Sequence, residues 1–594
     1  MLKIAALILL ALAACSKRQA SKGFDPDTYN YLTFNDADSL DPQYEYDSAS
    51  EMVIHNIYEQ LFWFEGGSTE KMTPLLATKV PSRENGLISA DGRTYTIPIR
   101  KGVKFHDGSE MTPEDVRYSL MRAMLSDREA GPASLLMQPL LGYPATRDDK
   151  GKLNLNAYKD AARAVTVEAD NVVLRLPKPF APMLSILAAV PNACVVPKKW
   201  LAAHGDWDGT EANWAKFNNP QKQTSPIYEQ ADGTGPFKLV RWDRATKETV
   251  LERNDGYWRA PAKLKRIVIK SVDEFNARKL ALQAGDADSI YADREVRSQV
   301  DNIPGVVVLD DLPTMEMNPM LYFTFHMNAQ GNPYTGSGKL DGDGIPEDFF
   351  SDIEVRKGFA YAFDYEGFIR DVDRNKAIQA TGFVPYSLPG HNPDQKKYEY
   401  DPGKAAEHFK KAFGGQVWEK GFRFTMLFNT SNQPRQSLCQ ILKHGIEALN
   451  PKFRIDVRPI DWPAFLDAQQ AHKLPVFILG WNADYPDAHN FAFPIMHSKG
   501  MYPFDQHYAN AEADKLIDAA VYESNPAKRK KLYARVQEIE YEDVPNLVIH
   551  DGTRLRVQRD WVKGFVPNPI YCDPPYGTCF YTIYKSTATE AAGK

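Results

Sequence analysis

The sequence predicts a protein of mixed α/β lobes, because short apolar strands and amphipathic helices alternate irregularly along its 594 residues. Strand-like runs occur at 32–34, 237–242, 250–252 and 267–269, with a helix ending at Gly285 after them. No internal repeat is present, which argues against a solenoid. With 43% hydrophobic residues, the chain is long enough for roughly two to four domains with sizeable cores.

Taken in order, the elements have recognisable boundaries. Tyr95, Ile97 and Ile99 alternate around Pro98, which predicts an edge strand, since a central strand would not tolerate the proline. Helix starts are predicted where a capping residue precedes an apolar stripe at helical spacing, at Thr112, Asp352 and Asp401. Two amphipathic helices are expected over 511–540, and a last buried strand over 547–549.

The N-terminal residues 1–14 have the pattern of an export signal. Lys3 precedes about nine apolar residues, roughly half of the twenty that a spanning helix requires. Residues 12–15, Leu-Ala-Ala-Cys, resemble the lipobox at which bacterial lipoproteins are cleaved and their cysteine diacylated. We expect an exported protein anchored through lipid on Cys15 and a tether over 15–26, facing the periplasm or cell exterior. An ordinary secretory signal with an incidental cysteine is the alternative.

Disulfide bonds between the other cysteines have to be considered, because export leads to an oxidising compartment. Cys572 and Cys579 close a short, turn-rich loop, and we expect them to be bridged. Cys194 and Cys439 lie in apolar or helical surroundings, where buried thiols are expected, although a bridge between them is also open. No Cys/His spacing indicates zinc.

An insertion at 331–350 is rich in Gly and Asp. Asp341, Asp343 and Glu347 provide an oxygen-ligand spacing that could hold Ca²⁺. The EF-hand register fails at its first and last positions, Lys339 and Phe350, so a solvated turn loop is the alternative. We expect no cofactor beyond this structural Ca²⁺.

Two function classes lack support in the sequence. A net charge of −6 does not provide the basic excess that phosphate neutralisation on nucleic acid requires. A secreted hydrolase needs a nucleophile or a metal, and neither HExxH nor GxSxG is present. The nearest candidates, His106-Asp107 and the pair Asp487 and His489, lie in turns where a capping role is expected. We therefore predict a protein that is not an enzyme.

One segment has the character of a ligand site. Residues 475–479 are wholly apolar and too few for a helix, which predicts a buried strand. Trp481 and Asp484 follow where this strand stops, and ligands commonly bind beyond strand ends in sheets flanked by helices. An aromatic ring beside a carboxylate suits a cationic, partly apolar ligand. Asp484 is the predicted anchor; capping of the turn that contains Asp487 is the alternative role.

With these landmarks, the chain resembles bacterial extracellular solute-binding proteins of the family that includes the oligopeptide- and dipeptide-binding proteins of ABC importers. The resemblance spans nearly the whole mature chain. Its landmarks lie at residues 40–42, 57–61, 94–119, 233–237, 254–258, 355–357, 360–362 and 480–491.

The resemblance implies a two-lobed periplasmic-binding-protein type II fold with an extra subdomain, and a ligand enclosed between the lobes. Lobe closure is then a hinge motion around the ligand. The expected divisions are lobe I at 27–73, 225–314 and 549–594, subdomain II at 74–224, and lobe III, which carries the anchor motif, at 315–548.

The resemblance also implies a monomeric lipoprotein that captures peptides and delivers them to a membrane permease. In peptide-binding members, the acidic residue of this motif pairs with the peptide's α-ammonium, and it matches Asp484. Trp481 and Asn482 match the positions that border the peptide backbone. Tyr46 and Ser48 fall where the opposite lobe approaches the ligand.

Other ligands stay open, because relatives of this fold bind nickel complexes, haem, opines or oligosaccharides. A signalling lipoprotein and a secreted hydrolase are less favoured alternatives.

Overall fold

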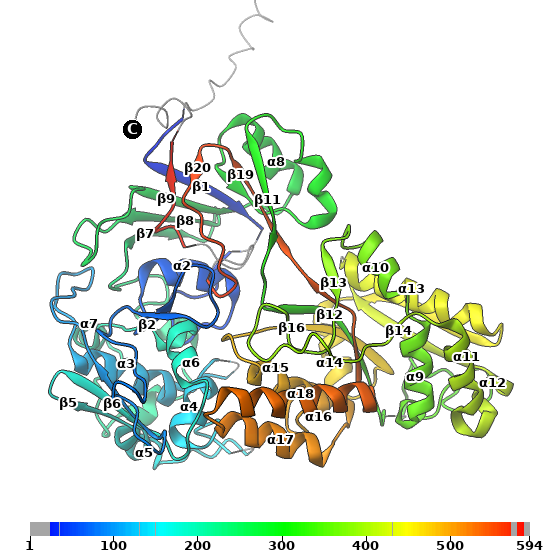
Figure 1. The fold of residues 1–594 in the computed structure, drawn as a ribbon. Helices are drawn as coiled ribbons and strands as arrows, with labels where there is room; N and C mark the ends of the chain where they lie inside the picture. Colours follow the sequence, from blue (N-terminus) through cyan, green and yellow to red (C-terminus); the bar gives the residue numbers. More distant parts are fainter. Residues whose placement is uncertain are drawn as a thin grey trace, which may run out of the picture.

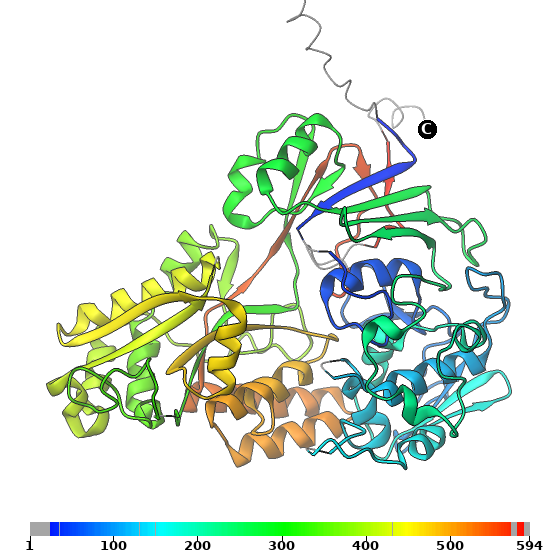
Figure 2. The same ribbon diagram turned by 180° about the vertical axis from the view of Figure 1, so that it is seen from behind.

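The computed structural model describes residues 24–34, 36–129, 131–148, 150–328, 330–430, 432–571 and 579–586. They form two bodies that lie side by side and are connected by extended strands (Figures 1 and 2). The first body contains the N-terminal half of the chain and the C-terminal strands. The second contains most of the C-terminal half, and its helices α15 to α18 lie next to the first body.

The first body is built on a seven-stranded sheet in the order β11-β19-β10-β1-β9-β8-β7. β1 runs parallel to β9 and β10, and the other pairs are antiparallel. Its strands are β1 (Thr28–Thr33), β7 (Phe237–Asp243), β8 (Glu248–Arg253), β9 (Arg266–Ser271), β10 (Ser289–Ile290), β11 (Val306–Leu312) and β19 (Arg554–Arg559). With them lie helices α2 (Ser48–Ile57) and α8 (Phe275–Ala284), and the pairs β2 (Phe62–Phe64) with β3 (Met72–Pro74) and β20 (Val562–Lys563) with β21 (Tyr584–Lys585).

A subdomain is attached to this body and shares one continuous hydrophobic core with it. Its sheet has the order β4-β6-β5, which leaves β4 at the edge, as Pro98 predicted. Thr112 and Asp115 form the capping box of α3, which confirms the predicted helix start. The elements are β4 (Thr94–Pro98), β5 (Val165–Glu168), β6 (Asn171–Arg175), α3 (Pro113–Ser126), α4 (Ser134–Leu141), α5 (Ala157–Ala164), α6 (Met183–Ala189) and α7 (Lys198–Ala203).

The second body contains two hydrophobic cores on either side of the sheet β16-β12-β17. Its strands are β12 (Glu316–Phe323), β13 (Ala377–Gln379), β14 (Phe422–Asn429), β15 (Phe453–Ile460), β16 (Val476–Asn482), β17 (Asn546–Val548) and β18 (His550–Gly552). Its helices are α9 (Ile353–Ala362), α10 (Tyr365–Asp371), α11 (Pro402–Lys411), α12 (Gln416–Lys420), α13 (Gln433–Leu449), α14 (Trp462–Gln470), α15 (His489–Met496), α16 (Met501–Gln506), α17 (Ala511–Tyr522) and α18 (Pro526–Asp543). The predicted caps Asp352 and Asp401 each accept a backbone N–H at the start of a helix, α9 and α11 respectively.

The chain passes between the bodies in two extended crossings, from β11 to β12 and from β18 to β19. Both crossings are short, so the bodies are linked by a few residues of extended backbone. Such connections are the usual hinge of a two-lobed binding protein. The exact residue boundaries predicted for the lobes stay a prediction.

Several smaller predictions concern the cysteines and membrane-spanning helices. Cys194 and Cys439 are buried thiols without a bridge. Cys15 and Cys572 lie outside the described residues, and the bridge between Cys572 and Cys579 stays a prediction. Within the described part of the chain, no helix is long and apolar enough to cross a membrane.

The described residues include no cluster of three His, Cys, Asp or Glu side chains that could hold a metal ion. Asp341, Asp343 and Glu347 are therefore not brought together as a ligand set. Asp341 instead accepts hydrogen bonds from the Ser337 hydroxyl (2.7 Å) and the Asp343 N–H (3.0 Å). This geometry corresponds to the turn-loop alternative.

Candidate ligand-binding site

The predicted anchor segment begins where β16 ends, on the side of the second body that faces the first. β16 is antiparallel to β12, with Asn482 opposite Glu316. Gly480 allows this close pairing, since a Cβ there would lie 2.3 Å from the Cβ of Asn318. The turn that carries Asp484 lies between this strand and α15.

Asp484 is held by neutral hydrogen-bond donors. The side-chain amide of Asn490 donates to its Oδ2 at 2.9 Å, and the hydroxyl of Tyr46 donates to its Oδ1 at 2.7 Å. The Oδ1 of Asn490 accepts in turn from the Asp484 N–H (2.9 Å) and from the Trp481 indole N–H (3.1 Å). These contacts fix the carboxylate in one orientation.

Tyr46 connects the two bodies, because it immediately precedes α2 of the first. Asp47 caps this helix by accepting from the Ser50 N–H (2.9 Å) and the Ser50 hydroxyl (2.6 Å). The other end of α2 is fixed by the Gly233-Thr234-Gly235 segment, where the Gly235 N–H donates to the Ile57 carbonyl at 2.8 Å. The start of α2 is therefore presented directly to Asp484.

The bodies touch at further points around this contact. The Ala181 N–H donates to the Val521 carbonyl (2.9 Å), and the Thr69 hydroxyl donates to the Ser387 carbonyl (3.0 Å). The ring of Phe180 lies edge-on to His489, with centroids 6.1 Å apart. The structure thus has the two lobes in contact around Asp484.

Three carboxylates, those of Asp484, Glu51 and Glu45, lie at this contact. Burial raises the pKa of Asp484, and the hydrogen bonds from Tyr46 and Asn490 offset only part of this effect. Burial also raises the pKa of Glu51 to about 8, with further contributions from the charges of Asp484 and Asp47. The pKa of Glu45 is raised by burial and then by the nearby charges of Glu51 and Asp47. Among the described residues, no Lys, Arg or His forms an ion pair with Glu45, Glu51 or Asp484.

Asp487, three residues along the same turn, has a different environment. The guanidinium of Arg529 donates to both of its carboxylate oxygens at 2.6 Å. Asp487 Oδ1 also accepts from the His489 N–H at 2.8 Å, which is the turn-capping role that the sequence predicted. Its charge is thus fully compensated within the protein.

The remaining predicted residues lie around this contact between the two bodies. Trp481 lies edge-on to Tyr502, with ring centroids 6.1 Å apart, and Asn482 is exposed at the end of β16. Ser48 is the first residue of α2 and is partly exposed; Ser50, not Ser48, anchors the cap. Asn490, Glu45 and Glu51 are functional residues that were not predicted from the sequence. Asn490 belongs to the motif itself, whereas only their place in the fold distinguishes Glu45, which is buried, and Glu51, which is partly buried, from ordinary surface acids.

A cavity of about 640 Å³ lies between the bodies. It is lined from the first body by Arg278, Tyr291 and Arg294, and from β12 by Glu316, which pairs with Asn482. This volume is within the usual range for small-molecule sites, and the lining carries charges of both signs. The cavity can therefore hold a solute of moderate size; Asp484 and Tyr46 are not among the residues that line it.

The family model described as "Bacterial extracellular solute-binding proteins, family 5 Middle" matches residues 71–503. The chain belongs to this family. It is therefore a solute-binding protein of extracellular type, as the resemblance implied.

Individual relatives cover nearly the whole chain. Heme-binding protein A of Haemophilus influenzae is 25% identical over 96% of this chain and 96% of its own length. The dipeptide-binding protein of Escherichia coli is 24% identical, covering 94% of this chain and 92% of its own. DppE, a dipeptide-binding protein of Bacillus subtilis, is also 24% identical, over 90% and 89%.

Solved structures share the fold. The periplasmic binding protein DppA of Helicobacter pylori, in complex with the peptide STSA, has a TM-score of 0.70 at 22% identity, covering 94% of this chain and 98% of that one. NikZ of Campylobacter jejuni, in complex with Ni(L-His), has a TM-score of 0.68 at 21% identity, covering 95% and 100%. These similarities confirm the two-lobed type II fold.

Proposed function

We propose that this protein captures peptides for an ABC importer and that Asp484 binds the α-ammonium of the peptide. The observation that carries the proposal is the contrast within one turn: among the described residues, Asp487 has a guanidinium partner, whereas Asp484 has only neutral donors. A partly buried carboxylate without a positive partner has a desolvation cost, so a ligand that brings the charge gains affinity from it.

The chemistry of the surroundings favours a cationic ligand end. The charges of Asp484 and Asp47 repel the carboxylate of Glu51 and raise its pKa, and the charge of Glu51 in turn raises the pKa of Glu45. An ammonium would relieve this repulsion. The propionates of a haem or a free carboxylate would increase it, so a peptide N-terminus suits this end of the cleft better than haem does.

The remaining parts of the proposal follow from the sequence. Export through residues 1–14, lipid attachment at Cys15, delivery to a membrane permease and a monomeric state are proposed together with the peptide ligand. Relatives named as dipeptide-binding proteins support the ligand class, as does a related structure that contains a peptide.

The test measures how much the peptide's α-ammonium contributes to the binding affinity. Calorimetry would compare a free peptide with its N-acetylated form on the wild type, on Asp484→Asn and on Asp394→Asn, an exposed aspartate of the same body. We expect acetylation or Asp484→Asn to weaken binding by about 2 to 5 kcal/mol, and Asp394→Asn to have no effect. Equal affinity for the acetylated peptide would overturn the assignment of Asp484.

The ligand class has its own test. Native mass spectrometry of protein purified without denaturation would identify an enclosed ligand directly. We expect peptide masses, and a co-purified metal complex, haem or sugar in their place would contradict the proposal.

A further inference from the structure

The subdomain contacts the second body at the end of the molecule that lies away from the hinge. Figures 1 and 2 show α17 and α18 next to the subdomain, whereas the crossings from β11 to β12 and from β18 to β19 lie toward the other end. A rotation about these crossings displaces the most distant surfaces by the greatest amount. Opening of the lobes therefore requires that the contact between the subdomain and α17 is broken.

One segment of the subdomain makes this contact. Residues 176–182, the strap, connect β6 to α6 and have the sequence Leu-Pro-Lys-Pro-Phe-Ala-Pro. Each of the three prolines restricts the backbone, so little conformational entropy is lost when the strap docks on another surface. Tyr95 of β4 holds the strap on the subdomain, because its hydroxyl donates to the Phe180 carbonyl at 3.4 Å.

The strap docks on the C-terminal end of α17. The Ala181 N–H donates to the Val521 carbonyl at 2.9 Å. Three residues earlier, the Lys178 ammonium lies 4.9 Å from the centre of the Tyr522 ring, within the range of a cation–π contact. A main-chain hydrogen bond and a side-chain contact thus join the same two segments.

Apolar side chains are buried between the bodies at the same place. Val521 is 3% exposed and belongs, with Tyr485, to the hydrophobic core of the first body that also contains Phe180. Ile517 and Ala520, which precede Val521 on α17, belong to a core of the second body instead. Separation of the bodies would expose Val521 to water, and exposure of one valine side chain corresponds to about tenfold in the closing equilibrium.

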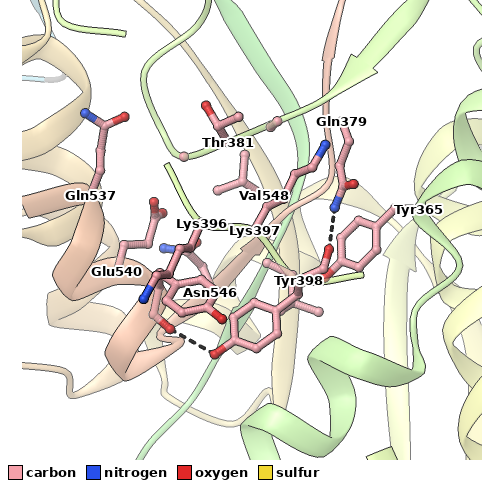
Figure 3. A pocket seen from close by; sticks show the side chains of 14 residues that line it. Tyr365, Gln379, Thr381, Lys396, Lys397, Tyr398, Gln537, Glu540, Asn546 and Val548 are labelled. Carbon is pink, nitrogen blue, oxygen red and sulfur yellow. Dashed lines mark hydrogen bonds between the residues drawn. The ribbon is translucent and has the colours of Figure 1, made fainter. Parts of the chain in front are cut away.

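The surface on which the strap docks is firmly attached to the second body. Arg529 of α18 donates to the Ala520 carbonyl at 2.9 Å, and its guanidinium also holds Asp487. α18 is fixed in turn by Tyr398, whose hydroxyl donates to the Tyr541 carbonyl at 2.9 Å (Figure 3). Movement of the strap away from α17 is therefore movement of one body relative to the other.

We propose that the strap is a latch that favours the closed lobes whether or not a solute is bound. None of its residues is among those that line the cavity of about 640 Å³. A solute that binds the closed lobes would thus gain affinity from the strap contact in addition to its own contacts. The inference depends on the two-lobed fold and its hinge, and not on the solute being a peptide.

Small-angle X-ray scattering of the intact mature protein without solute tests the latch. Wild type would be compared with Val521→Asp, which places a charge in the contact, and with Ala519→Asp, at an exposed position of the same helix. We expect Val521→Asp to increase the radius of gyration and Ala519→Asp to leave it unchanged. Val521→Ala should give a smaller increase, and it keeps the test valid if the aspartate prevents folding. Equal radii for the wild type and the folded Val521 variants would overturn the proposal.

Calorimetry distinguishes the latch from the ligand anchor. Val521→Asp should weaken the binding of a free peptide and of its N-acetylated form by the same factor, about tenfold, because the strap acts independently of the ligand's charge. Asp484→Asn should instead remove the difference between the two forms. A loss confined to the free peptide in Val521→Asp would contradict the latch. Failure of the wild type to bind any peptide would contradict the proposed function, and the scattering comparison would still decide on the latch.

Discussion

Asp484 and Asp487 lie in one turn, and their contrast shows how one loop can combine a structural and a binding role. Asp487 is paired on both oxygens with Arg529 and accepts the His489 N–H in the turn before α15. Asp484 is oriented by Asn490 and Tyr46 but receives no positive charge. The compensated acid fixes the backbone, and the uncompensated one is thereby positioned for a cationic ligand.

The largest expected effect on stability concerns the compensated acid. Arg529→Ala should lower the free energy of unfolding by about 3 kcal/mol or more, because it leaves Asp487 buried without its partner. Urea or thermal unfolding would measure this loss. A stable Arg529→Ala protein would show that Asp487 is not a structural acid.

The matched substitution at the other acid, Asp484, should leave the free energy of unfolding almost unchanged. Asp484→Asn keeps the shape of the side chain and removes a charge that has no partner, so stability should stay within about 1 kcal/mol of the wild type. A large destabilisation in the same unfolding assay would show that Asp484, like Asp487, has a structural role.

Proton release on ligand binding is a further way to test the difference between Asp484 and Asp487. Burial raises the pKa of Asp484, burial together with the charges of Asp484 and Asp47 raises that of Glu51 to about 8, and a cationic ligand favours the ionised forms. Binding at about pH 5 to 7, where the peptide's α-amine is already protonated, should therefore release protons, and affinity should fall as the pH is lowered through this range. Calorimetry in buffers of different ionisation enthalpy measures the release; proton uptake would contradict the charge assignment.

Tyr46→Phe should have the smallest effect. It removes the hydroxyl that donates to Asp484 but keeps the ring, so peptide affinity should change by about 1 kcal/mol in either direction. An increase would mean that the hydroxyl competes with the ligand's ammonium, and a decrease that it orients the carboxylate. The same calorimetric titration decides, and a loss as large as that of Asp484→Asn would assign Tyr46 to the anchor itself.

Local chemistry made much of the architecture predictable. Capping residues such as Thr112 and Asp352 mark helix starts because their side chains satisfy exposed N–H groups within a few residues. The apolar run that became β16 and the proline at the edge of β4 follow from similarly short-range rules. The calcium prediction did not gain such support, because a suitable spacing of acids does not bring their oxygens together.

The sequence by itself determined that an acidic residue would follow a buried strand in a two-lobed binding protein, and it singled out Asp484. Only the tertiary structure decided which acid in that turn is compensated, because Arg529 lies 42 residues from Asp487 and Tyr46 lies 438 residues from Asp484. The same holds for the carboxylates of Glu45 and Glu51. Charge compensation and burial depend on neighbours brought together by folding, and no spacing along the chain records them.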